Sequence, residues 1–228
     1  MNQLKRLLLT SVGRKLTMGI SGLGLLGFVL VHMLGNMTIF QGPERLNAYA
    51  AWLQNHPLIW LARAGLLGVF ALHIWTALTL VRDARKARGG RYASQNLIAA
   101  TPSSRSIVYS GIGVLLFVIF HLLHFTFGVV QSEGFHGIDA NGRHDVFSMV
   151  IAGFQQPQWA ALYVLAMIVL GFHLSHALKS VLQTLGLNHA SYNAVLRIGG
   201  RLLVGVIILG NCSFPILVYF GVINGGGK

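Results

Sequence analysis

The chain has 228 residues, of which 54% are hydrophobic and only 10% are charged. A soluble globular domain carries about 25% charged residues, so the composition excludes an ordinary soluble domain and favours a protein solvated by lipid. The formal net charge of +12 is typical either of nucleic-acid binding or of a membrane protein with one basic side. The single cysteine, Cys212, excludes an internal disulfide, a cysteine-ligated iron–sulfur cluster and any cofactor attached through paired cysteines.

Five apolar stretches are long enough to cross a bilayer, which takes about 20 residues of helix: Met18–Phe40, Pro57–Val81, Ile107–Val130, Pro157–Leu182 and Leu202–Ile223. The apolar runs are continuous and not alternating, and an open sheet would leave backbone groups unpaired in lipid. We therefore predict an all-α fold in which residues 1–228 form one transmembrane bundle of five helices. The N-terminal segment resembles a signal peptide, but its apolar run is too long, so we expect a retained first span.

Basic residues are concentrated on one side of the predicted spans. Thirteen of the 17 lysines and arginines lie before the first span, or in the loops between the second and third and between the fourth and fifth spans with their flanks. Four of the five acids lie on the other side, namely Glu44, Glu133, Asp139 and Asp145. The positive-inside rule then predicts a cytoplasmic N-terminus and an external C-terminus. Because the cations are spread over three juxtamembrane segments and form no single stripe, we predict membrane lipid and no nucleic acid as a partner.

Two external segments are expected outside the spans. Leu46, Tyr49, Ala50 and Leu53 recur at helical spacing, which predicts a short amphipathic helix at the membrane interface. The segment from Gln131 to Gln156 is polar and contains glycine, and we predict that it is an external loop.

Six histidines fall inside the predicted spans: His32, His73, His121, His124, His173 and His176. Ionisable residues inside the hydrocarbon are costly and are functional by default. A lone histidine in a span is explained equally well by a hydrogen bond between helices. Six histidines on four helices indicate a shared ligand.

The depths of these histidines sort them into two levels. From the helix rise, His32 and His121 each lie roughly 21 Å from the basic side, whereas His73 and His173 each lie roughly 12 Å from it. Each level therefore has one histidine from each of two helices. Haem iron takes axial imidazoles from opposite sides, and facing helices supply them. The two levels predict two haems stacked across the membrane. Glycine and serine residues on the ligand faces, such as Ser21, would leave room for a flat macrocycle.

Spans three and four carry a second histidine, His124 or His176, three residues after the first. Depth does not favour either of the two histidines on each helix as the ligand. The member that is not a ligand is expected to orient a ligand or to hydrogen-bond another helix. Cations near the basic ends of the helices (Arg14, Lys15, Arg105 and Lys179) are candidates to bind haem propionates, or serve only to set the orientation in the membrane.

These residues resemble a known family, the dihaem cytochrome b membrane subunits of succinate:quinone oxidoreductase and fumarate reductase, in their five-span, single-anchor form. The resemblance covers nearly the whole chain and includes Val31-His32-Met33-Leu34, Leu72-His73-Ile74, Phe120-His121-Leu122 and Phe172-His173-Leu174-Ser175. It implies that the first histidine of each motif is a haem ligand, so that His121 and His173 are favoured over His124 and His176. It pairs His73 with His173 and His32 with His121.

The resemblance further implies a place in the bacterial cytoplasmic membrane. It implies a cytoplasmic flavoprotein, an iron–sulfur subunit docked on the basic side, and a quinone substrate that is usually menaquinone in this branch. An external quinone site beside Trp52, Trp60 and Arg63 is one possibility, and an interfacial aromatic belt is the other. Three alternatives remain at this point: a dihaem subunit of a formate dehydrogenase or hydrogenase, a transporter with a histidine proton relay, and a passive anchor. The transporter is disfavoured because no acid lies clearly within a span.

Overall fold

The computed structural model describes residues 10–87, 106–131, 134–187 and 189–225, and within these residues every regular element is helical. Five helices are long and apolar enough to cross a membrane. They are α2 (Ser11–Asn36), α4 (Ile59–Ala87), α6 (Ile107–His121), α8 (Pro157–Thr184) and α9 (Asn193–Tyr219). The 3-10 helix η1 (Met37–Gln41) extends α2, and the π-helical turn η2 (Leu122–Thr126) extends α6. The predicted all-α bundle of five spans is confirmed.

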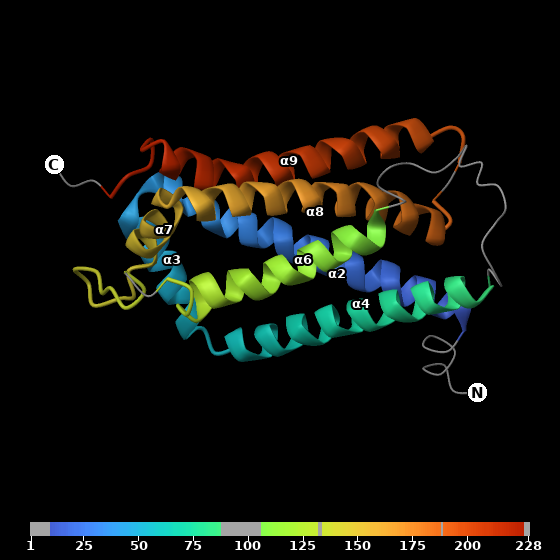
Figure 1. Ribbon diagram of the computed structural model, residues 1–228, viewed down its shortest axis with the longest axis horizontal. Coiled ribbons are helices and arrows are strands. Elements are labelled where there is room, and N and C mark those ends of the chain that lie inside the picture. The colour runs from blue at the N-terminus through green and yellow to red at the C-terminus, as the bar shows by residue number, and fades with distance from the viewer. Residues whose placement is uncertain (1–9, 88–105, 132–133, 188, 226–228) are drawn as a thin grey trace.

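Two shorter helices, α3 (Pro43–Asn55) and α7 (Val146–Gln155), lie together at one end of the bundle (Figure 1). The helix α3 agrees with the predicted amphipathic segment. The prediction that the whole of Gln131–Gln156 is a loop is wrong, because its second half forms α7. This helix begins where the Asp145 carboxylate accepts a hydrogen bond from the Ser148 amide, which satisfies one of the free N–H groups of the first turn. Its apolar side chains Phe147, Ile151 and Phe154 are then buried in the bundle.

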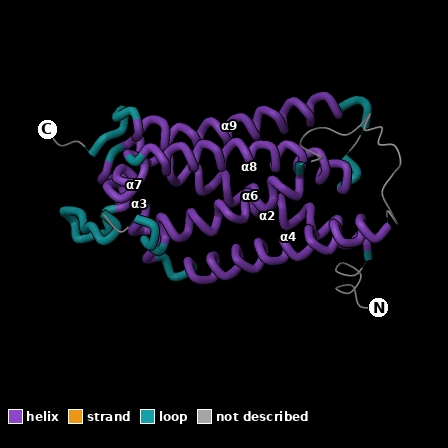
Figure 2. The backbone as a smooth tube through the Cα atoms, in the orientation of Figure 1, coloured by secondary structure: helices purple, strands orange, loops and turns teal. Residues whose placement is uncertain are grey.

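The helices are packed in the order α4, α2, α8, α6, and α9 covers the outside of α2 and α8. Figure 2 shows these long helices running side by side, and α2 begins at the opposite end from the end of α9. The helix α9 begins nine residues before the predicted start at Leu202, because its first turns contain Arg197, Arg201 and two glycines that lower the local hydropathy. A helix can therefore extend beyond the apolar layer.

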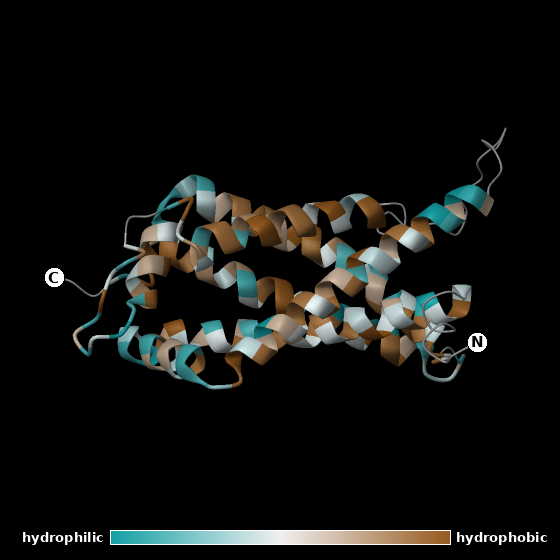
Figure 3. Cartoon of the chain, turned by 90° about the horizontal axis from the view of Figure 1, so that it is seen from below, coloured by the Kyte–Doolittle hydropathy of each residue, from teal (hydrophilic) through white to brown (hydrophobic). Residues whose placement is uncertain are grey.

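The outer surface of the bundle is apolar, as expected for helices that face lipid. Leu61, Leu67 and Leu78 on α4 are between 64% and 71% exposed, and contiguous apolar surface of this kind would be unstable in water. Hydrophobic residues line much of the length of the long helices, whereas hydrophilic residues gather toward the two ends (Figure 3). One cluster of buried side chains lies where α2, α8 and α9 meet (Leu26, Leu174, Val204 and Ile207). A larger one lies at the end that carries α3 and α7 and includes Met33, Leu46, Phe147 and Phe154.

The end of the bundle that carries α3 and α7 is closed by a polar cluster, here called the α3–α7 cap (residues 43–55 and 134–155). Arg143 pairs with Glu44 at 2.7 Å and with Asp139 at 2.6 Å. Hydrogen bonds from its guanidinium lower the pKa of both carboxyls, so both stay ionised at neutral pH. Three of the four acids predicted on this side therefore lie together in the cap, while Glu133 is outside the described residues.

Asn47 joins the parts of the cap and is only 1% exposed. Its amide oxygen accepts from the Phe147 N–H at 2.9 Å, and its amide nitrogen donates to Asp145 at 2.9 Å. Replacing Asn47 with leucine leaves these buried groups unpaired, which costs about 1–3 kcal/mol for each group. We expect the midpoint of thermal unfolding in detergent to fall by several degrees, at about 2–4 °C per kcal/mol for a chain of this size.

The matched control is Asn55→Leu, since Asn55 lies on the same helix with its side chain exposed. That variant should melt within a degree or two of the wild type. Equal melting points for Asn47→Leu and Asn55→Leu would show that the Asn47 hydrogen bonds do not stabilise the cap.

Candidate cofactor-binding site

The structure brings the predicted histidines together in the two predicted couples. The ring centres of His32 and His121 are 5.8 Å apart, and those of His73 and His173 are 6.5 Å apart. In each couple the ring planes are close to perpendicular, at 83° and 69°. All four side chains keep part of their surface accessible.

Both couples span the interior of the bundle. His32 on α2 faces His121 on α6, and His73 on α4 faces His173 on α8. Among the described residues, these two combinations of helices do not pack closely against one another, and neither do α4 and α6. The four helices thus form an open four-sided arrangement with a gap between α4 and α6, and each histidine couple lies on a diagonal of it. A ligand held by a couple would lie between the helices.

The spacing within each couple suits one metal ion between the two rings. An imidazole nitrogen binds a metal ion at about 2 Å, so rings on opposite sides of one ion have centres about 6 Å apart. Within the described residues no group of three or more histidine, cysteine or acidic side chains gathers as a metal site would. Two ligands are too few for a structural zinc site, which needs four. Two axial imidazoles are sufficient where a porphyrin fills the remaining positions.

Hydrogen bonds at the couple His73–His173 involve Nδ1 of each ring. The Ser21 hydroxyl donates to the Thr17 carbonyl at 2.7 Å, and its oxygen lies 3.1 Å from Nδ1 of His73. Because the hydroxyl proton is already donated, the oxygen accepts from Nδ1–H, and Nε2 is unprotonated. Ser110 does the same for His173: it donates to the Ile107 carbonyl and lies 3.4 Å from Nδ1. Metal-binding histidines usually donate their second N–H in this way.

Two glycines leave room for these rings. A Cβ atom at Gly22 would lie 3.2 Å from Cε1 of His73, and one at Gly111 would lie 3.5 Å from Cε1 of His173. Each glycine directly follows the serine that binds the same ring. The serine and glycine on one helix therefore position a histidine on the neighbouring helix, twice in the bundle.

The couple His32–His121 has different surroundings. The Tyr163 hydroxyl lies 3.1 Å from Nδ1 of His121, so Nε2 of that ring is not used by this hydrogen bond. His32 departs from the pattern, because its Nε2 lies 3.2 Å from the amide nitrogen of Asn36. Binding a metal ion through this nitrogen requires the Asn36 side chain to turn aside.

The second histidines lie in unlike environments. His124 is only 1% exposed and lies 3.2 Å from the Tyr163 hydroxyl through its Nδ1. It belongs to the π-helical turn η2, and such turns are frequent at functional sites. His176 is partly exposed on α8, one turn beyond His173. Neither lies in a histidine couple.

The candidate cations differ as well. Arg14 forms an ion pair with Asp83 at 2.7 Å, and its Nε is a buried donor without a hydrogen-bond partner. An acceptor such as a propionate would satisfy it. Lys15 and Lys179 are exposed, and Arg105 lies outside the described residues.

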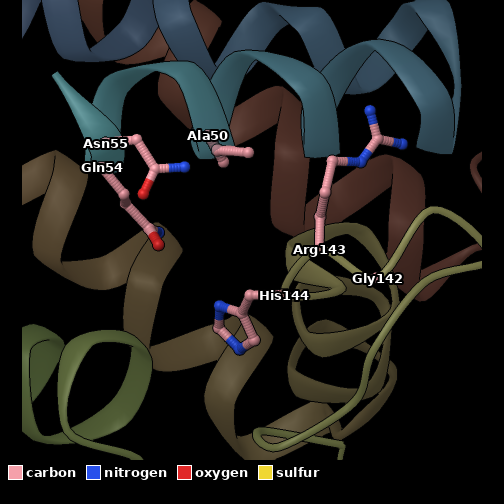
Figure 4. Close-up of a pocket in the computed structure, with 7 residues that line it drawn as sticks. Ala50, Gln54, Asn55, Gly142, Arg143 and His144 are labelled. Carbon is pink, nitrogen blue, oxygen red and sulfur yellow. The ribbon is translucent and has the colours of Figure 1, made fainter.

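The residues predicted for an external quinone site lie at the α3–α7 end and are exposed. Trp60 is 71% exposed with Arg63 stacked over its ring at 4.8 Å, and Trp52 is 61% exposed, as in an interfacial belt. A polar pocket of about 260 Å³ lies nearby in the cap, lined by Gln54, Asn55 and His144 (Figure 4). The Arg143 guanidinium is bound by Glu44 and Asp139 and is not free for a ligand.

Ser110 and Tyr163 were not among the residues singled out by the sequence. A repeat could have revealed Ser110: Ser21-Gly22-Leu23-Gly24 precedes His32 as Ser110-Gly111-Ile112-Gly113 precedes His121, with eleven residues from serine to histidine in both. Tyr163 is 42 residues from His121, and no pattern in the sequence links them.

The fold and the exposed apolar helices define a multi-pass α-helical membrane protein. Comparison of the chain with models of protein families, with curated proteins and with solved structures found no match.

Proposed function

We propose that this chain is the membrane-anchor cytochrome b subunit of a succinate:quinone oxidoreductase. In this role it binds two b-type haems and carries electrons between a cytoplasmic iron–sulfur subunit and a membrane quinone, menaquinone being the expected species. The observation that carries the proposal is the presence of two diagonal histidine couples, 5.8 and 6.5 Å between ring centres, at two levels of one bundle. A flavoprotein partner would carry the succinate chemistry.

The residues of the chain have distinct tasks in this proposal. His73 and His173 would bind one haem, and His32 and His121 the other; haem iron supplies one-electron transfer when bound. Ser21, Ser110 and Tyr163 hold Nδ1 of three of these rings.

The two levels lie farther apart than the sequence depths suggested. Ser21 marks the first level on α2 and His32 the second, so eleven residues of helix separate them by roughly 16 Å. The depths of roughly 12 and 21 Å gave a difference of only about 9 Å. The reason is that the predicted basic-side ends of the two spans lie at different levels: Met18 is only three residues from Ser21, whereas Val81 is eight residues from His73.

The distribution of charge supports the proposed orientation and partners. Arg14, Lys179 and Arg201 lie toward the end opposite the α3–α7 cap, and the cap contains Glu44, Asp139 and Asp145. With the positive-inside rule, the basic end faces the cytoplasm of a bacterial cell. An iron–sulfur subunit would dock there, close to the His73–His173 couple.

The test is to purify the tagged chain from its native membrane in mild detergent. The expected result is a reduced-minus-oxidised spectrum of low-spin b haem, two haems per chain, with a flavoprotein and an iron–sulfur protein in the same peak. Two haems with a formate dehydrogenase or hydrogenase partner would reassign the complex. A chain without haem would overturn the proposal.

A further inference from the structure

Tyr163 occupies a position that the proposed function does not by itself explain. Its side chain is buried in α8, 7% exposed, and its hydroxyl lies between two histidines of the neighbouring segment. The hydroxyl oxygen is 3.1 Å from Nδ1 of His121 and 3.2 Å from Nδ1 of His124. A tyrosine has one proton to donate, so it cannot donate to both rings.

A third residue determines the direction of these hydrogen bonds. Nε2 of His124 lies 3.2 Å from the side-chain oxygen of Gln131. That oxygen can only accept, so Nε2 of His124 carries a proton. In the neutral ring Nδ1 is then an acceptor, and Tyr163 donates to it. The Tyr163 oxygen must accept from Nδ1–H of His121, which leaves Nε2 of His121 without a proton.

Packing holds this chain of hydrogen bonds in place. The His124 ring stacks on Phe125 with centres 4.0 Å apart and contacts Trp159 at 5.7 Å. A Cβ atom at Gly153 of α7 would lie 2.8 Å from the Phe125 ring and 3.4 Å from His124. The glycine therefore lets α7 close over both rings, and the buried His124 has little freedom to turn.

We propose that Tyr163 is a positioning residue for His121. His124 sets the direction of the tyrosine hydroxyl by accepting from it at Nδ1, and Gln131 fixes His124 by accepting from its Nε2–H. This proposal rests on the proposed function, because it gives His121 the role of a haem ligand. The hydroxyl keeps His121 in the tautomer that binds metal through Nε2. By accepting from Nδ1–H it also makes the ring a stronger electron donor, which stabilises oxidised iron. The haem at His32–His121 would accordingly have a lower reduction potential than without Tyr163.

The experiment compares Tyr163→Phe with the wild-type protein in its complex. We expect two haems per chain in both, a more positive potential for the haem at His32–His121 in the variant, and no change at the other haem. Tyr109→Phe is the matched control, because Tyr109 is 77% exposed on α6; it should leave both potentials unchanged. A merely structural role for Tyr163 would move both haems or neither, and either result would overturn the proposal.

A second measurement tests the hydrogen bonds without reference to haem. Nitrogen-15 NMR of histidine-labelled, reduced protein should show His124 protonated at Nε2 in the wild type, and also in Tyr163→Phe, because Gln131 still accepts from that nitrogen. His124 protonated at Nδ1 in the wild type would overturn the proposed chain. Absence of haem, with His124 protonated as expected, would instead overturn the proposed function and the role given to Tyr163 while leaving the hydrogen bonds established.

The double variant Tyr163→Phe/His124→Phe completes the test. If His124 acts only through Tyr163, its loss in the Tyr163→Phe background should not shift the reduction potential of the haem at His32–His121 any further. The effects of substitutions within one hydrogen-bond network are not additive. An additional shift of similar size would show that His124 acts on the haem independently, and would contradict the proposed order of donors.

Discussion

Each of the four substitutions His32→Leu, His73→Leu, His121→Leu and His173→Leu is expected to lower the haem content of the purified chain from two to one. A leucine cannot bind iron, and a haem held by a single imidazole would be lost during purification. The measurement is haem per chain from the absorption of the pyridine complex, with the protein determined by amino-acid analysis.

The pairing of the histidines predicts different haem contents for different double variants. Since His73 and His173 are 6.5 Å apart and would bind the same haem, the double variant should still retain one haem, with the spectrum of the other site. A double variant taken from different couples, such as His32→Leu/His73→Leu, should retain none. His176→Leu is the matched control on α8, and it should retain two.

Some variants will fold poorly, and rescue addresses that outcome. Replacing His173 with glycine opens a space that free imidazole can enter, so added imidazole should restore the second haem if the residue acts as a ligand. Two retained haems in any of the four leucine variants would remove that histidine from the ligand set.

The second large effect concerns Gly22, which touches no cofactor in the proposal. Its Cβ position lies 3.2 Å from Cε1 of His73, so a leucine there would push the ring out of line with His173. We expect Gly22→Leu to lose the haem at His73–His173 and to retain the haem at His32–His121. Gly111→Leu should lose the same haem from the opposite side, because its Cβ position lies 3.5 Å from Cε1 of His173.

Gly27 provides the control on the same helix. No atom lies within 4 Å of its Cβ position, and glycine-to-leucine changes have similar effects on helix propensity at both sites. Gly27→Leu should therefore keep both haems. Loss of the same haem in Gly27→Leu and Gly22→Leu would mean that the effect comes from the helix and not from contact with His73.

The five spans were predictable because a helix that crosses lipid needs about 20 consecutive, mainly apolar residues. The helix α7 was missed because it has only ten residues and packs against protein, where neither span length nor strict amphipathicity is required. The start of α9 was misplaced because Arg197 and Arg201 lie on a helix that extends beyond the apolar layer. Hydropathy locates the layer and not the ends of the helix.

The histidine couples were predictable in outline, because depth along a helix follows from sequence position. The choice of His121 over His124 came from the family resemblance, and geometry explains the difference: His121 faces His32, whereas His124 faces Tyr163 and Gln131. The role of Tyr163 depends on how α6 and α8 cross, which sequence spacing does not contain. The Asn36 contact with His32, by contrast, follows from their spacing of four residues on one helix.

The repeated serine, glycine and histidine spacing in α2 and α6 has an evolutionary consequence. The hairpins α2–α4 and α6–α8 have the same build, and the diagonal couples join equivalent positions of the two. An ancestral hairpin of half the length could pair with a second copy about a twofold axis along the membrane normal. Two histidines in the hairpin would then supply both couples, because each would face its equivalent in the second copy. Fusion of two such copies would free each half to change separately, which is how one histidine couple can acquire Tyr163 while the other keeps its two serines.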